Sequence, residues 1–263
     1  MNIQETNRVL EAYQHLLQAE KNKKSVAPLT DLYPGITILD AYRIQMKSMD
    51  QKVKDGQNVV GKKIGLTSFA MQKLLGVDQP DYGHLLDSME VPNGGTLPME
   101  TLFNPKVESE LAFVLKKDLI GPAVTVEEVL EATDYIVPSI EIVDSRITDW
   151  KIKLEDTVAD NASCGLFALG SHRFDPKGMD LTKIEMRLYK NGEFMNKGTG
   201  ADVLGHPATC VAWLATKLAE YDVKLKAGEV ILSGALSAAV IAQKGDVFTA
   251  EFGQLGTVKV SFG

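Results

Sequence analysis

The pattern of apolar and polar positions changes character near residue 60. Before that point apolar residues recur at helical spacing in two segments. The first ends at the polar run 21–24, and the second begins after Thr37 and Asp40, a capping-box pattern. Beyond it the apolar segments are short and are separated by Gly, Asn, Asp and Pro, as is typical of strands joined by turns. The predicted strands are 59–66, 112–115, 135–143, 166–169, 184–190, 230–233, 247–251 and 257–262.

Two further helices are predicted within the strand-rich part. Thr125 and Glu128 form a second capping-box pattern before 126–133, and Pro207 suits the first position of a helix continuing over 208–221. Strands outnumber helices beyond residue 60 and do not alternate with them. The pattern therefore favours a mixed, β-rich α+β fold over a doubly wound parallel sheet. We divide the chain into a helical N-terminal region, 1–60, and a β-rich domain, 61–263.

Composition and charge exclude several classes of function. The 263 residues can bury a substantial core, and the net charge of −7 with a pI near 5.2 argues against a nucleic-acid partner. No apolar run is long enough to span a bilayer, and the first residues lack the apolar core of a signal peptide. We therefore expect a soluble cytoplasmic protein with no membrane partner. Cys164 and Cys210 lie far apart without a CxxC spacing, which indicates neither a disulfide framework nor a zinc site.

Two glutamates interrupt the apolar run 105–115. Because side chains at i and i+2 of a strand share a face, Glu108 and Glu110 are predicted to project side by side. In an apolar environment their repulsion would cost several kcal/mol, which a hard divalent metal such as Mg²⁺ or Mn²⁺ would offset. Glu141, in the second strand-like run 136–146, supplies a third carboxylate. The alternative is a sheet with one solvated face, on which glutamates alternate with apolar residues for solubility.

Adjacent lysines occur in the first predicted strand. Lys62 and Lys63 must point to opposite faces, so one is expected to be solvated and the other can point inward. An inward lysine near three carboxylates would be a proton donor or an electrostatic clamp for an anionic substrate. The alternative is a pair of surface lysines on an edge strand.

Two turn-rich segments add candidates. Segment 75–85 is predicted to be a loop folded over a site, in which Asp78 or Asp81 acts as an acid or base or only initiates a turn. Segment 156–165 packs small and polar residues before a strand, as expected near a ligand or in a buried polar turn. Cys164 has no basic or histidine neighbour in the sequence, so we do not expect a nucleophile there. His206 is predicted to cap the helix that follows it.

Six ordered motifs together resemble one family. They closely match the 2-hydroxypenta-2,4-dienoate (vinylpyruvate) hydratases and the related 4-oxalocrotonate decarboxylases of the fumarylacetoacetate hydrolase superfamily, over nearly the whole chain. The resemblance implies a mixed β-sandwich roll with a helical N-terminal region, a homo-oligomer, and Mg²⁺ or Mn²⁺ as cofactor. The motifs are 61–68, 75–83, 105–110, 156–165, 204–207 and 227–234.

The same resemblance implies roles for individual residues. It assigns acid–base catalysis to Lys63 and Asp78 in the β-rich catalytic domain. The metal ligands that it implies are Glu108, Glu110 and Glu141. The substrate contacts that it implies, with less direct motif support, are Thr67, Asp160, Ser163, Ser233 and Gly234.

The activity that this resemblance implies is that of a lyase in aromatic meta-cleavage catabolism, which hydrates the small molecule 2-hydroxypenta-2,4-dienoate to 4-hydroxy-2-oxopentanoate. The alternative is decarboxylation of 4-oxalocrotonate (2-oxo-3-hexenedioate). Segments 77–81 and 161–165 look like the hydratase, whereas 237–240 looks more like the decarboxylase. An acylpyruvate hydrolase, a further alternative, usually needs a Glu–His dyad for which we find no local motif. A complex with the partner decarboxylase is left open.

Overall fold

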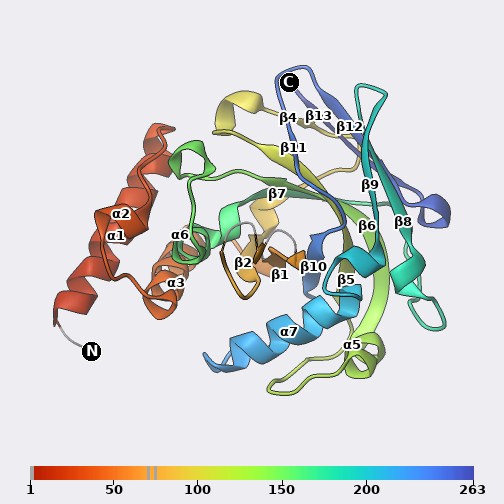
Figure 1. Cartoon of the computed structure of the whole chain (residues 1–263), viewed down its shortest axis with the longest axis horizontal. Helices are drawn as coiled ribbons and strands as arrows, with labels where there is room; N and C mark the ends of the chain where they lie inside the picture. Colours follow the sequence, from red (N-terminus) through yellow and green to blue (C-terminus); the bar gives the residue numbers. More distant parts are fainter. Residues whose placement is uncertain (1–2, 70–71, 74–75) are drawn as a thin grey trace.

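Three helices open the chain and lie together on one side of the molecule (Figure 1). The computed structural model describes residues 3–69, 72–73 and 76–263. The helices are α1 (Ile3–Asn22), α2 (Leu29–Leu32) and α3 (Ile38–Lys54). The predicted capping box of α3 is confirmed, because the Asp40 amide donates to the Thr37 hydroxyl and the Asp40 carboxylate accepts from the Thr37 amide, both at 3.2 Å. No helix among the described residues combines the length and the apolar composition needed to cross a membrane.

The larger of two sheets carries most of the candidate residues. Its strands run in the order β2-β1-β10-β5-β6-β7-β3, with β11 paired to β5. Pairs β1–β10 and β3–β7 are parallel and the other pairs are antiparallel, so the sheet is mixed as predicted. The strands are β1 (Val59–Gly65), β2 (Asp81–Leu86), β3 (Glu90–Val91), β5 (Lys106–Leu115), β6 (Thr133–Val143), β7 (Cys164–Leu169), β10 (Val230–Ala235) and β11 (Val240–Ile241).

A smaller sheet packs on the larger one and completes the α+β fold. Its strands run in the order β4-β13-β12-β8-β9, and β13 packs against β6 and β7. Phe248 and Phe262 meet edge to face in the core, with ring centroids 5.8 Å apart. The strands are β4 (Thr96–Leu97), β8 (Glu185–Lys190), β9 (Glu193–Thr199), β12 (Val247–Glu251) and β13 (Thr257–Phe262).

Three helices of the described part of the chain, α5, α6 and α7, lie among the strands. Helix α5 (Val126–Ala132) begins at the predicted capping box of Thr125 and Glu128, and α7 (Pro207–Ala219) packs against α5 and β10. His206 caps α7 as predicted, because its Nδ1 accepts from the Ala208 amide at 3.1 Å. The short helix α6 (Leu154–Ala159) was not predicted.

The eight predicted strands are present, but five strands of the described chain were not predicted: the short strands β3, β4 and β11, and the longer strands β2 and β9. The segment 75–85 was predicted to be a loop, whereas its second half forms β2, which is buried along its whole length. Asp81 and Gly83, which indicate a turn in the sequence, lie within this strand, where pairing with β1 supplies the backbone hydrogen bonds. Strand β9 was not predicted, because it is a largely exposed edge strand with little apolar alternation. The helices end at Lys54 and β1 begins at Val59; the division into two domains stays a prediction.

Candidate active site

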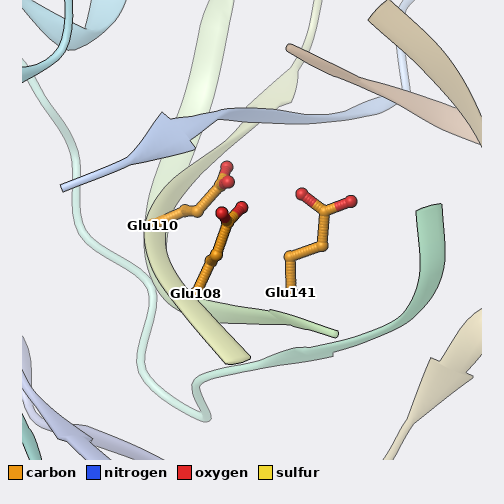
Figure 2. A group of neighbouring side chains, drawn as sticks. All are labelled: Glu108, Glu110 and Glu141. Atoms are coloured by element: carbon orange, nitrogen blue, oxygen red, sulfur yellow. The ribbon is translucent and has the colours of Figure 1, made fainter. Parts of the chain in front are cut away.

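The structure brings the three predicted glutamates together. Glu108 and Glu110 lie on the same face of β5, and Glu141 stands directly opposite Glu108 on the antiparallel strand β6. Each residue offers a carboxylate oxygen, and these oxygens lie within 4.8 Å of one another. Figure 2 shows the three carboxyl groups turned toward one shared space. Strand periodicity therefore places two of the carboxylates, and strand register adds the third.

This cluster carries more negative charge than its surroundings compensate. Glu110 and Glu141 are fully buried. Burial, with Glu141 and other nearby carboxylates, raises the pKa of Glu108 to about 7 and raises that of Glu110 well above its usual value. Glu110 Oε1 and both carboxylate oxygens of Glu141 find no hydrogen-bond partner among the described residues. Since unpartnered buried carboxylates are costly and oxygen donors suit hard cations, the cluster fits Mg²⁺ or Mn²⁺.

Lys63 is the cation beside this cluster. It comes from β1, is buried, and places Nζ 3.4 Å from Glu141 Oε1 and 3.1 Å from the Ala162 carbonyl oxygen, to which it donates. Burial alone would lower the pKa of Lys63, but Glu141, Asp81 and Glu108 outweigh burial and raise it. Lys63 is therefore a charged ammonium at neutral pH.

The expectation that the other lysine is solvated was wrong. Lys62 points to the opposite face of β1, as strand geometry requires, but it is only 3% exposed. Its Nζ donates to both carboxylate oxygens of Glu229 at 2.7 Å. Glu229 lies far from Lys62 in the sequence. Its carboxylate offsets the cost of removing the Lys62 ammonium from water.

The structure separates the two aspartates of the turn-rich segment. Asp78 is exposed, whereas Asp81 is 4% exposed at the start of β2. A methyl group built on Gly65 would lie 2.2 Å from Asp81 Oδ1 and 3.0 Å from Lys63 Nζ, so the two side chains meet over this glycine. Thr157 donates to Asp81 Oδ2 at 2.6 Å, while Oδ1 is unpartnered within the described part of the chain. The carboxylate near Lys63 is thus that of Asp81, and a catalytic role for Asp78 stays a prediction.

The predicted contacts on β10 and after β1 support the glutamates. The Gly234 amide donates to Glu110 Oε2 at 2.8 Å. Thr67 packs closely on Gly234: a Cβ built on residue 234 would lie 2.2 Å from Thr67 Oγ1. The backbone φ of Gly234 is +104°. Only glycine combines that φ with that approach. The Ser233 hydroxyl donates to the Leu111 carbonyl at 2.8 Å, so its predicted substrate contact stays untested by this geometry.

The predicted residues Asp160 and Ser163 lie on either side of Ala162, whose carbonyl oxygen accepts a hydrogen bond from Lys63. The Asp160 carboxylate accepts from Arg146 and Ser145 and supports the chain beside the site, and its contact with substrate stays a prediction. The Ser163 hydroxyl is buried and has no hydrogen-bond partner in the described residues. Arg146 was missed by sequence reasoning, since an arginine beside a strand gives no signal until its partners are known.

Cys164 lies next to the site without the properties of a nucleophile. Burial, and then the nearby carboxylate of Glu141, raise the pKa of its thiol well above the usual value. A thiol at neutral pH is a poor nucleophile, so the sequence-based expectation agrees with the surroundings of Cys164.

Comparison with known proteins identifies the family. The model of the fumarylacetoacetate (FAA) hydrolase C-terminal domain matches residues 84–262. The chain belongs to the fumarylacetoacetate hydrolase family. Within this family it is 48% identical to a 2-hydroxyhexa-2,4-dienoate hydratase of Comamonas testosteroni, over 95% of each chain. It is 47% identical to a 2-keto-4-pentenoate hydratase of Paraburkholderia xenovorans, over 96% of this chain and 94% of that one.

A solved structure of the fumarylacetoacetate hydrolase family shares the whole fold. The 4-oxalocrotonate decarboxylase from Pseudomonas putida G7, complexed with magnesium and adipate, superposes with a TM-score of 0.95 over 98% of both chains, at 38% identity. The predicted family and the predicted α+β fold are therefore confirmed.

Proposed function

We propose that this protein is a metal-dependent hydratase that converts 2-hydroxypenta-2,4-dienoate to 4-hydroxy-2-oxopentanoate in aromatic meta-cleavage catabolism. The hydratase names of relatives at 47–48% identity over nearly the full chain support the reaction class. The observation that carries the proposal is the convergence of Glu108, Glu110 and Glu141 beside the buried pair Lys63 and Asp81. This set combines a metal platform with two groups for moving protons.

We assign the metal to the three glutamates. The magnesium in the related decarboxylase and the unpartnered buried oxygens of this cluster support Mg²⁺, and Mn²⁺ suits the same donors. When bound, the metal supplies Lewis-acid stabilisation of negative charge on the oxygens of a 2-oxo acid. The Gly234 amide fixes one oxygen of Glu110 for that purpose.

Lys63 and Asp81 divide the proton transfers. Lys63 is held as an ammonium by Glu141 and the Ala162 carbonyl, so it can donate a proton to C5 of the dienol, and the amine that remains can take the proton of the enol hydroxyl, which completes ketonisation. The conjugated enone that results is open to water at C4. Asp81 has one oxygen bonded to Thr157 and one unpartnered among the described residues. This second oxygen can accept a proton from the water that adds to C4 and then return that proton to C3, which completes the hydration.

Decarboxylation of 4-oxalocrotonate is the second candidate. It is favoured by the TM-score of 0.95 to the decarboxylase of Pseudomonas putida G7. A decarboxylase substrate carries a second carboxylate, however, and the anionic Asp81 would repel it by on the order of 1 kcal/mol or more if the two approach closely. We therefore rank hydration first.

One pair of incubations separates the two activities. Purified protein with Mg²⁺ receives either freshly generated 2-hydroxypenta-2,4-dienoate or 2-oxo-3-hexenedioate, and the products are identified by mass spectrometry. We expect 4-hydroxy-2-oxopentanoate from the first and little carbon dioxide from the second. Rapid carbon dioxide release without hydration would reverse the assignment.

We further propose that the protein acts in the cytoplasm as a homo-oligomer. Large exposed apolar side chains at Phe194 and Met195, on the edge strand β9, are consistent with further burial between subunits. A monomer in sedimentation at micromolar concentration would contradict the oligomer. Co-sedimentation with the partner decarboxylase would test the complex that the sequence leaves open.

A further inference from the structure

The segment that faces Lys63 has an unusual backbone. Asn161, Ala162 and Ser163 are consecutive, none is glycine, and all three have left-handed φ values of 54°, 50° and 53°. Side chains with a Cβ disfavour this region, and only asparagine among the three adopts it readily. The surroundings must therefore impose the conformation, and strain of this kind concentrates at functional sites.

Arg146 holds both ends of this segment. Its Nε donates to Asp160 Oδ1 at 2.5 Å and its Nη2 donates to the Asp160 carbonyl, and Asp160 directly precedes the segment. Its Nη1 donates to the carbonyl of Cys164, which directly follows the segment, at 3.1 Å. The same Nη1 donates to the Asp144 carbonyl at 2.7 Å. One planar guanidinium thus spans the segment, which the point charge of a lysine cannot do.

Two further contacts hold the middle of the segment against β2. The Asn161 side chain accepts from the His84 amide at 2.7 Å and donates to the His84 carbonyl at 2.9 Å. At Gly83 a Cβ would lie 2.4 Å from the Asn161 carbonyl oxygen, so the strand can approach this closely only because residue 83 is glycine. The segment is therefore fixed from two sides.

The consequence is the placement of one carbonyl. The Ala162 oxygen accepts from Lys63 Nζ at 3.1 Å, and Glu141 lies 3.4 Å from the same Nζ. The ammonium is thus located by one carboxylate and by one carbonyl of the strained segment. Relaxation of residues 161–163 would turn that carbonyl away and free Lys63 to move.

We propose that Arg146 is a positioning residue, which keeps residues 161–163 in the conformation that aims the Ala162 carbonyl at Lys63. This inference rests on the proposed function, because it takes Lys63 as the group that transfers the proton. Besides the bond to the Asp144 carbonyl, the side-chain hydrogen bonds of Arg146 to described residues go to Asp160 and Cys164, which flank the segment. Its loss should reduce the rate of proton transfer more than it reduces substrate or metal binding.

The test compares Arg146→Ala and Arg146→Lys with the exposed control Arg187→Ala on β8. We expect kcat to fall about 10- to 100-fold in both Arg146 variants, with KM and the Mg²⁺ affinity from calorimetry changed less than about threefold. The control should match the parent. Arg146 lines a cavity of about 220 Å³ whose wall includes the exposed Lys23, so methylguanidine can enter and should restore part of kcat to Arg146→Ala.

Further measurements separate positioning from general loss of structure. Assays run well below the thermal midpoint of each variant, where a purely structural role would leave kcat unchanged. Gly83→Ala, which displaces Asn161 with Arg146 intact, should show the same selective loss of kcat. If Arg146→Ala does not fold, Arg146→Lys and Gly83→Ala decide the outcome.

Three results would overturn the proposal: an unchanged kcat in Arg146→Lys, a loss of metal affinity equal to the loss of kcat, or folded Arg146→Ala that methylguanidine does not improve. A crystal structure of Arg146→Ala gives a readout that needs no substrate. An intact hydrogen bond from Lys63 to Ala162 in it would refute the positioning role. Failure of the parent protein to hydrate the dienoate would instead refute the proposed function alone.

Discussion

The paired substitutions Asp81→Asn and Asp78→Asn test which carboxylate activates water. Asp81 is buried beside Lys63 and has an unpartnered Oδ1 among the described residues, whereas Asp78 is exposed. Asparagine has nearly the same shape as aspartate, and its amide oxygen can still accept from Thr157. The substitution at 81 therefore removes the proton-accepting charge while it keeps the packing of β2.

The size of the expected loss follows from this placement. A positioned acid or base contributes about 10²- to 10⁴-fold to rate, which corresponds to about 3–5 kcal/mol of transition-state stabilisation. We expect Asp81→Asn to lose kcat within that range. Asp78→Asn changes a surface group, for which effects stay within about 0.5 kcal/mol, or roughly twofold.

The assay follows the ultraviolet absorbance of the conjugated dienol, which hydration removes, with mass spectrometry of the product. Mg²⁺ affinity and the thermal midpoint are measured in parallel, so that a folding or metal defect is recognised. Retention of activity by Asp81→Asn within about threefold of the parent would refute the reasoning. So would a loss in Asp78→Asn as large as in Asp81→Asn.

Three more predictions follow from the same structure. Chelation should abolish turnover and Mg²⁺ should restore it, whereas Glu110→Gln should stay inactive at the Mg²⁺ concentration that saturates the parent; chelator-resistant turnover would exclude the metal site. Lys63→Ala should lose at least about a hundredfold in kcat with metal affinity retained, whereas Lys62→Ala, on the opposite face, should chiefly lower the thermal midpoint. Burial lowers the pKa of His84 to about 3, so its contribution to folding stability is complete above about pH 6.5 and is lost as the pH falls toward 3. Acidification to pH 4.5 should lower the free energy of unfolding by about 3 kcal/mol through this residue. In urea unfolding, acidification should lower the free energy of unfolding less in His84→Gln than in the exposed control His172→Gln.

Much of the fold could be predicted from local pattern. The capping boxes at Thr37 and Thr125 and the proline at the start of α7 mark helix ends through contacts three or fewer residues away, which a sequence displays directly. The pairing of Glu108 and Glu110 likewise follows from the two-residue period of a strand. Such features depend on residues that are close in the sequence, so they can be recognised without the tertiary structure.

Features that depend on distant partners could not be predicted. Lys62 was expected to be solvated because its ion-pair partner, Glu229, lies 167 residues away. Arg146 gave no signal, since its role comes from carbonyls of a segment whose backbone conformation is itself set by tertiary contacts. Whether a charged side chain can be buried depends on its ion-pair or hydrogen-bond partner, and the sequence alone does not identify a distant partner.

The choice between Asp78 and Asp81 depends on strand register. In the antiparallel pair of β1 and β2, Gly65 stands opposite Asp81 and Lys63 stands opposite Gly83, so all four residues share one face. A slip of one residue would turn Asp81 to the other face, because side chains alternate. Gly83 pins the register, since a larger residue there would collide with the Asn161 carbonyl. The glycines that read as loop signals in the sequence thus fix the strand pairing that delivers Asp81 to Lys63.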